Sequence, residues 1–224
     1  MYIKICGITK LDQAQAIAQM GVEALGFICV SSSPRYISPL QIGQITSSLP
    51  TLEPRVGQRV TTLELIGVFL NASPEEIFQT LIQGGLNGVQ LHGDESPEFC
   101  SELRSHLDKT NINRQIKLIK ALRVKNAEGL AQAQIYSDVV DTILLDAYDP
   151  QMAGGTGKTI DWQMLRDFRP RCPWWLAGGL SPENVKQAIA LVSPDGLDVS
   201  SGVERSAGDK DLFKVEQFLA NSRY

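Results

Sequence analysis

The sequence predicts an α/β fold in which eight strands alternate with helices around a closed (β/α)8 barrel. Short runs rich in Ile, Val, Leu and Phe recur eight times, and the segments between them have helical periodicity. The run centres lie near residues 4, 27, 68, 90, 118, 144, 175 and 198, so most spacings are 22 to 31 residues. A doubly wound open sheet is the alternative. Eight units that close with little chain left over favour the barrel.

Each expected strand is one of these apolar runs. They lie at 2–6, 24–30, 65–70, 88–91, 116–122, 139–146, 174–177 and 196–200. The wide gap between the second and third strands contains a polar insertion at 50–62, and a second insertion occupies 108–115. Both follow a helix and precede a strand, so in a TIM barrel they lie on the face opposite the functional one. We expect both insertions to be mobile and uninvolved in chemistry.

Several of the expected helices begin with Ser followed by Pro. In the segment 73–85, Ser73 is the expected N-cap and Pro74 lies in the first turn, followed by acidic residues near the positive helix end. The same opening occurs at 38–49, 96–107 and 181–192, while 11–21 carries apolar residues at helical spacing before Gly21.

The composition limits the class of protein. The chain has 224 residues, of which 43% are hydrophobic, and a formal charge of −4, which suits a single soluble domain covering residues 1–224. No apolar run approaches the roughly 18 residues that a membrane span needs, and the first residues lack a signal-peptide hydrophobic region. We therefore expect a cytoplasmic protein that binds no membrane. The mild acidity also argues against nucleic-acid binding.

The cysteines and histidines do not have the spacing of a metal site. The four cysteines form no C-x-x-C pair, and only two histidines are available as imidazole ligands. Disulfides are not expected in a reducing compartment. We expect no metal, and we expect most of the cysteines to be small buried apolar residues.

The stretch "GGTGKT" at 154–159 resembles a nucleotide-binding phosphate loop, but its context does not fit. The motif requires Gly five residues before Gly157, and the sequence has Met152 there. The loop should also follow its strand directly, yet seven residues separate Asp146 from Gly154. We interpret the run as a glycine-rich loop over a different phosphorylated ligand, and Lys158 is given no role.

In a barrel the functional groups lie at the carboxyl ends of the strands. Cys6 and Asp146 end the first and sixth strands, so a thiol and a carboxyl could act as base and acid on one substrate. The alternative is that Cys6 is an inert thiol in the core. The planar guanidinium of Arg35 could bind a carboxylate through two hydrogen bonds. The alternative is that Arg35 is a solvated surface charge. His92 is either a ligand donor or a hydrogen-bonded core imidazole, and Asp198 could bind a ligand hydroxyl.

Residues with little or no side chain also gather at these strand ends. Barrels commonly hold a phosphate between the loops that follow strands seven and eight, at the N-terminus of a short extra helix. Ser201 and Glu204 have capping-box spacing and predict such a helix. The alternative is that the glycines in these loops only permit tight turns and bind no ligand. The glycines that let backbone N–H groups approach a ligand closely are Gly155, Gly157, Gly178, Gly179 and Gly202.

Together these motifs resemble the phosphoribosylanthranilate isomerase family of tryptophan biosynthesis. The resemblance runs from 4–9 through 26–38, 88–95, 119–122, 144–162, 174–185 and 196–211, and so extends along most of the chain. It departs in the two polar insertions and at Cys29 and Val30, where we expect an aromatic or larger apolar residue.

The resemblance implies an Amadori rearrangement without metal or cofactor, on a small phosphorylated substrate. It implies that Asp146 is the general acid that opens the furanose ring, and that Cys6 as thiolate removes the C2′ proton. It further implies that Arg35 pairs with the anthranilate carboxylate and Asp198 with a ribose hydroxyl. The 5′-phosphate ligands that it implies are Gly155, Gly178, Gly179, Ser200 and Ser201. The chain fits a monomer or a homodimer.

Two other functions remain open from the sequence. A phosphoribosyl isomerase of the histidine-pathway kind performs the same type of reaction, but its family has aspartate at the first strand end where this chain has Cys6. A non-catalytic barrel that binds a phosphorylated ligand is the second alternative, and it predicts that Cys6→Ala retains full function.

Overall fold

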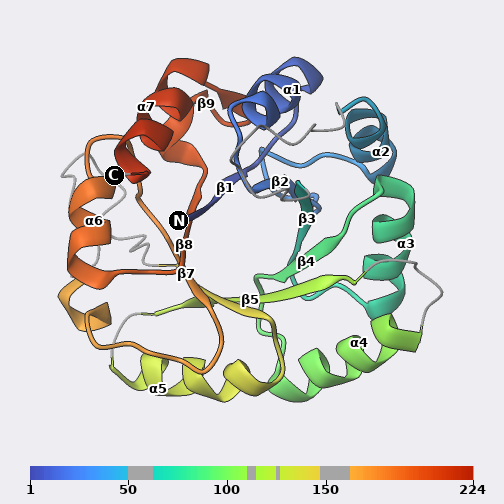
Figure 1. Cartoon of the computed structure of the whole chain (residues 1–224). Helices are drawn as coiled ribbons and strands as arrows, with labels where there is room; N and C mark the ends of the chain where they lie inside the picture. Colours follow the sequence, from blue (N-terminus) through green and yellow to red (C-terminus); the bar gives the residue numbers. More distant parts are fainter. Residues whose placement is uncertain (50–62, 110–114, 125–126, 147–161, 224) are drawn as a thin grey trace.

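The structure is a computed structural model that describes residues 1–49, 63–109, 115–124, 127–146 and 162–223 (Figure 1). The expected insertion at 50–62 and the glycine-rich loop with Gly155 and Lys158 lie outside the described residues. Of the second insertion, residues 110–114 also lie outside them, and its first two residues continue a helix to Lys109.

Eight parallel strands of the described chain close into a barrel, so the predicted barrel is confirmed and the open sheet is wrong. Each strand pairs with the next one in sequence, and the last returns to the first through Tyr2 opposite Gly196 and Lys4 opposite Asp198. The strands are β1 (Tyr2–Cys6), β2 (Ala24–Ile28), β3 (Glu64–Phe69), β4 (Gly88–Leu91), β5 (Lys117–Arg123), β6 (Thr142–Asp146), β7 (Trp174–Ala177) and β8 (Gly196–Val199).

Helices surround this ring of strands (Figure 1). They are α1 (Leu11–Gln19), α2 (Pro39–Ser47), α3 (Pro74–Gly84), α4 (Pro97–Lys109), α5 (Ala127–Ile135), α6 (Val185–Val192) and α7 (Leu212–Ser222). Short 3-10 turns add η1 (Tyr136–Asp138), η3 (Trp162–Leu165) and η4 (Ser201–Val203).

The Ser-Pro openings start helices at some positions and not at others. Ser38 forms a reciprocal capping box with Gln41, and the Ser73 side chain accepts from the backbone N–H of Glu76, as predicted. The opening at 181–184 was wrong as a helix start. There residues 182–184 form a turn, and α6 begins at Val185 with no side-chain cap from Asn184.

The sixth strand is shorter than the apolar run at 139–146 predicts. Residues Tyr136–Asp138 form η1, and the N–H groups of Val139 and Val140 both bond back to the Tyr136 carbonyl. That turn uses the backbone groups that strand pairing would need, so β6 begins at Thr142.

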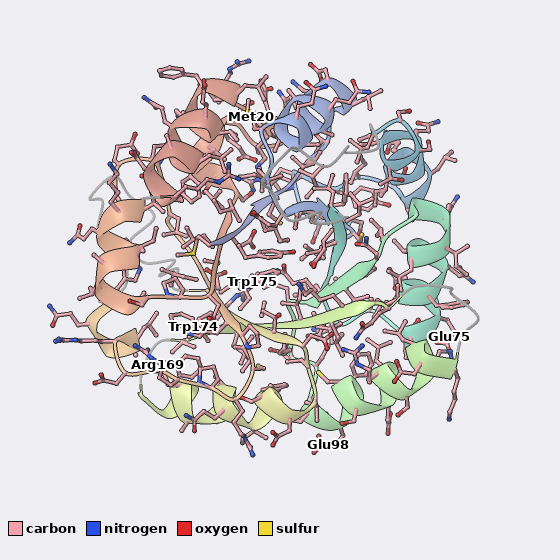
Figure 2. The ribbon with its side chains drawn as sticks, in the orientation of Figure 1. Met20, Glu75, Glu98, Arg169, Trp174 and Trp175 are labelled. Carbon is pink, nitrogen blue, oxygen red and sulfur yellow. The ribbon has the colours of Figure 1, made fainter. Side chains whose placement is uncertain are left out.

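Side chains alternate along the strands and so build two separate apolar layers. The outer layer packs the barrel against the helices, whereas Trp175 fills the barrel interior with Ile66, Ile119 and Leu144 (Figure 2). Tyr2 stacks on Trp175 with ring centroids 4.4 Å apart at the amino end of the strands. The barrel is therefore packed at this end, and open space for a ligand is left at the carboxyl end.

Among the helices of the described residues, none combines the length and the hydropathy that a membrane span requires.

A buried ion pair fixes the loop that follows β4. Lys120 on β5 is 1% exposed, and its Nζ lies 2.7 Å from Glu95 Oε2 and donates to the Gly93 carbonyl. Glu95 also accepts from the backbone N–H groups of Asn71 and Gly93. The pair therefore ties β5 to the loops after β3 and β4, close to the open end of the barrel.

We expect Lys120→Met to lower the free energy of unfolding by about 3–5 kcal/mol, because the change leaves the Glu95 carboxylate buried without its cation. The double variant Lys120→Met/Glu95→Gln should lose less of the free energy of unfolding than Lys120→Met alone, because no uncompensated charge remains. Urea unfolding of wild type, Lys120→Met, Glu95→Gln and the double variant measures this. A double variant as unstable as the sum of its two single changes would contradict the ion pair.

Candidate active site

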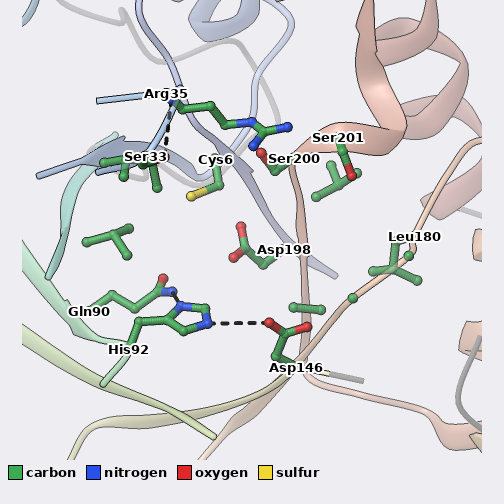
Figure 3. Close-up of a pocket in the computed structure, with 16 residues that line it drawn as sticks. Cys6, Ser33, Arg35, Gln90, His92, Asp146, Leu180, Asp198, Ser200 and Ser201 are labelled. Atoms are coloured by element: carbon green, nitrogen blue, oxygen red, sulfur yellow. Dashed lines mark hydrogen bonds and ion pairs between the residues drawn. The ribbon is translucent and has the colours of Figure 1, made fainter. Parts of the chain in front are cut away.

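A cavity of about 230 Å³ lies at the carboxyl ends of the strands (Figure 3). Its wall combines titratable side chains with the small residues of the loops after β7 and β8. It includes every predicted site residue that the structure describes, namely Cys6, Arg35, His92, Asp146, Gly178, Gly179, Asp198, Ser200 and Ser201. The positional rule for barrels therefore brings these residues to one place, and Gly155 lies outside the described chain.

Cys6 ends β1 and faces the cavity with 5% of its surface exposed. The strand stops here because Gly7 adopts a left-handed backbone conformation, with φ at 80°. Burial raises the pKa of the Cys6 thiol, and nearby Asp198 raises it further, while Lys4 and Lys210 lower it; the net pKa lies above its ordinary value. Cys6 lines the cavity, so the hypothesis of a reactive thiol stays a prediction beside that of an inert core thiol.

Lys4 is the feature of this site that the sequence reasoning missed. Its Nζ lies 3.0 Å and 3.1 Å from the two carboxylate oxygens of Asp198, and both side chains are buried. The signal was present in "YIKIC", because residues two apart in a strand share a face and Lys4 stands two before Cys6. Asp198 therefore meets the cavity already paired with a cation.

Asp146 ends β6 on the opposite side of the cavity from Cys6 (Figure 3). His92 Nε2 lies 3.3 Å from Asp146 Oδ2, and the Gln90 amide nitrogen lies 3.0 Å from His92 Nδ1. If the Gln90 amide donates to Nδ1, the imidazole proton is on Nε2, directed at the carboxylate. Gln90 was not among the predicted site residues, and its Oε1 has no hydrogen-bond partner among the residues that the structure describes.

Arg35 reaches the cavity from the loop after β2, where it is held by Glu204. Arg35 Nε lies 3.0 Å from Glu204 Oε1, and Nη2 lies 2.7 Å from Oε2. Lys210 Nζ adds a third bond, 2.8 Å from Glu204 Oε1. The alternative of a solvated Arg35 is wrong. Burial raises the pKa of Glu204, but its bonds to Arg35 and Lys210 outweigh burial and hold that pKa below its usual range.

The predicted capping box of Ser201 and Glu204 is wrong. The turn η4 is only three residues long and has no side-chain cap, and Glu204 begins the short strand β9 (Glu204–Ser206), which pairs with β10 (Asp209–Lys210). Its carboxylate is engaged by Arg35 and Lys210 instead. Two strong cationic donors outcompete a backbone N–H as partners for a buried carboxylate.

The loops after β7 and β8 approach each other closely. Gly178 and Gly179 have φ of 86° and 65°, which side chains rarely adopt. A Cβ at Gly202 would lie 1.9 Å from the Leu180 carbonyl oxygen, so only glycine fits there. Ser200 and Ser201 lie beside this contact and line the cavity. The arrangement leaves a rim of backbone and hydroxyl groups, as the predicted phosphate site requires.

The remaining polar residues do not form a metal site within the described ranges, where no group of three or more His, Cys, Asp or Glu could hold an ion. Cys6 is joined by no other cysteine in the cavity wall. All four cysteines are free, and burial raises the pKa of Cys29 to about 12 and that of Cys100 to about 11.

Comparison with known proteins gives one consistent result. The family model described as N-(5'phosphoribosyl)anthranilate (PRA) isomerase matches residues 3–221. The N-(5'-phosphoribosyl)anthranilate isomerase of Trichormus variabilis is 54% identical over 96% of this chain and 95% of its own. The protein of that name from Acaryochloris marina is also 54% identical, over 98% of this chain and 96% of its own.

Solved structures agree with the sequence relatives. The phosphoribosyl anthranilate isomerase of Thermotoga maritima superimposes with a TM-score of 0.84 at 38% identity, covering 100% of this chain and 98% of that one. A second structure holds the enzyme in complex with reduced 1-(o-carboxyphenylamino)-1-deoxyribulose 5-phosphate. It has a TM-score of 0.81 at 35% identity, with the same coverage.

We expect Glu204→Gln to destabilise the protein by about 3 kcal/mol at neutral pH, because Arg35 and buried Lys210 then share no anion. The folded-state pKa of Glu204 is depressed, so its contribution is present above the unfolded pKa of about 4.3 and is lost as the pH falls. Urea unfolding at a series of pH values measures the difference. The difference in the free energy of unfolding between wild type and variant should become smaller below about pH 4. A difference that stays constant with pH would contradict the role of the Glu204 carboxylate as the anion of this cluster.

Proposed function

This chain belongs to the N-(5'-phosphoribosyl)anthranilate isomerase family of tryptophan biosynthesis, and we propose that its cavity performs the family reaction with Cys6 and Asp146. The reaction is an Amadori rearrangement. It converts N-(5-phosphoribosyl)anthranilate to 1-(2-carboxyphenylamino)-1-deoxyribulose 5-phosphate. The observation that carries the residue assignment is that a thiol and a carboxyl face each other across one cavity at the open end of the barrel.

Asp146 acts first, as the general acid. It gives a proton to the furanose ring oxygen, the C1′–O bond breaks, and the anthranilate nitrogen supplies the electron pair that makes a Schiff base. His92 lies against the Asp146 carboxyl and is fixed in turn by Gln90, so the acid is held in one orientation. His92 also lines the cavity and contacts the substrate from the same side.

Cys6 acts second, as the general base. Its thiolate removes the proton from C2′, and the electron pair of that bond moves to neutralise the iminium and gives an enolamine. The enolamine then tautomerises to the ketone. Two groups of different chemistry on opposite sides of the substrate divide the acid and base work, and no cofactor is required.

Binding uses the rest of the cavity wall. Asp198 accepts a ribose hydroxyl beside Cys6, and Arg35 pairs with the anthranilate carboxylate. Because Arg35 Nε and Nη2 already engage Glu204, Nη1 and the second Nη2 proton face the ligand. The 5′-phosphate is held by Gly155, Gly178, Gly179, Ser200 and Ser201. Of these, Gly178, Gly179, Ser200 and Ser201 line the rim of the cavity, and Gly155 lies outside the described residues.

We further propose that residues 1–224 act as one cytoplasmic domain. Monomer and homodimer both fit the chain, and one similar structure, from Thermotoga maritima, is described as monomers generated from a dimeric enzyme. Sedimentation equilibrium distinguishes the two states.

We expect Cys6→Ser and Asp146→Asn each to lower kcat by at least about a hundredfold with little change in KM, because each removes one proton transfer and leaves the binding groups in place. The loss of substrate fluorescence with phosphoribosylanthranilate measures turnover. Near-normal kcat in either variant would reject that residue's role. Full activity of Cys6→Ala in a tryptophan auxotroph would favour the non-catalytic barrel.

We expect Arg35→Ala to raise KM by roughly tenfold or more, because a charge-assisted pair with the substrate carboxylate is lost. Glu204 keeps Lys210 as a partner in this variant, so folding should survive. The same fluorescence assay gives KM and kcat. Unchanged values of both would show that Arg35 does not bind the substrate carboxylate.

A further inference from the structure

Lys4 is a fully buried cation that the acid–base reaction described above does not use. It lies on the inward face of β1, two residues before Cys6, with none of its surface exposed. A buried ammonium group is costly unless it is paired. The pair with Asp198 satisfies that requirement, but a lysine at this position also brings a positive charge next to the proposed base.

The space over Gly26 shows how close the two groups are. A Cβ placed on Gly26 would lie 2.7 Å from Cys6 Sγ, 2.9 Å from Lys4 Cε and 3.0 Å from Lys4 Nζ. Sulfur and ammonium therefore converge on the same point of β2, where the residue has no side chain to separate them. The charge of Lys4 therefore acts on the Cys6 thiol as well as on Asp198, and it lowers the pKa of the thiol.

Charged groups face Cys6 from several elements. Lys4 comes from its own strand, Asp198 from β8, Lys210 from β10 and Arg35 from the loop after β2. The Cys29 thiol also lies near, and Asp146 and His92 face it across the cavity. Arg35 and Lys210 are both bound to Glu204. Lys4 is thus the cation with the largest effect on the Cys6 thiol, and Asp198 is the carboxylate that pairs with it.

We propose that Lys4 is a positioning residue that holds the Cys6 thiolate for proton abstraction, and that Asp198 competes with the thiolate for the same ammonium group. Before substrate binds, the Lys4 charge is neutralised by Asp198, and the thiol keeps its proton. A ribose hydroxyl that donates to Asp198 satisfies that carboxylate and turns Lys4 toward sulfur. The thiol proton leaves to solvent through the cavity mouth, and the thiolate then takes the C2′ proton.

This inference rests on the proposed function for the identity of the base, but the electrostatic part can be measured without turnover. The rate at which iodoacetamide alkylates Cys6 follows its thiolate fraction, so the rate against pH gives the thiol pKa. Peptide mapping by mass spectrometry separates Cys6 from Cys29, Cys100 and Cys172. The free protein is used, with no substrate present.

Removing Lys4 and removing Asp198 should shift the pKa of the Cys6 thiol in opposite directions. We expect Lys4→Met to raise the pKa of the Cys6 thiol by about one unit or more, because the adjacent positive charge is lost. We expect Asp198→Asn to lower it, because the competing anion is lost and Lys4 is left to the sulfur. Lys4→Arg, which keeps the charge, should leave the pKa closer to wild type than Lys4→Met does.

Lys120→Met is the matched control, because Lys120 is buried like Lys4 but forms its ion pair with Glu95. It should reduce stability without moving the Cys6 alkylation curve. Unchanged Cys6 pKa values in Lys4→Met and Asp198→Asn, or shifts of the same sign in both, would overturn the proposal. If Lys4→Met does not fold, an unchanged or raised pKa in Asp198→Asn alone overturns it. Normal turnover of Cys6→Ser would instead contradict the proposed base.

Discussion

The pairing of β8 with β1 is the constraint on which the site depends. This pairing closes the barrel, and its register sets Lys4 opposite Asp198 and Ile5 opposite Val199. Opposed residues of parallel neighbours point to the same face, so Lys4, Cys6 and Asp198 all enter the interior together. A slip of β1 by one residue would turn Lys4 and Cys6 outward into the apolar layer beneath the helices and leave Asp198 in the interior without its cation.

Closure also divides the cavity into two halves of different chemistry. The half built from β1, β2 and β8 carries Lys4 and Arg35, each tied to a carboxylate, around the thiol. The half built from β4 and β6 carries His92 and Asp146. Positive groups beside sulfur suit a base that must become an anion, and the contact with His92 fixes the orientation of the carboxyl that is proposed as the proton donor. The strand order therefore separates the proposed base from the proposed acid.

The fold and much of the site could be predicted from the sequence, because local patterns dictate them. The apolar runs locate the strands, and in barrels a residue at a strand end faces the mouth, so Cys6 and Asp146 could be paired before any coordinates. Lys4 was missed because its neighbours in sequence are apolar, and only closure of the barrel shows its partner Asp198, 194 residues away.

The error at Glu204 has the same cause. Glu204 has the spacing of a helix-capping residue, but Arg35 arrives from a distant loop and takes its carboxylate. A partner absent from the local pattern decides the structure there, which is why spacing alone could not predict it. At Ser181 the Ser-Pro pattern matches those of α2 and α3, and Asn184 bonds back to the Ser181 N–H as Gln41 does to Ser38, yet α6 begins only at Val185.

The most direct test of the account is a crystal structure of this protein with reduced 1-(o-carboxyphenylamino)-1-deoxyribulose 5-phosphate, the ligand bound to a similar enzyme. The account predicts that Cys6 Sγ lies about 3–4 Å from C2′ on one side of the ligand. Asp146 should lie on the other side, and the phosphate between the loops after β7 and β8. A ligand bound with both Cys6 and Asp146 on one side, or with its C2′ out of reach of the sulfur, would contradict it.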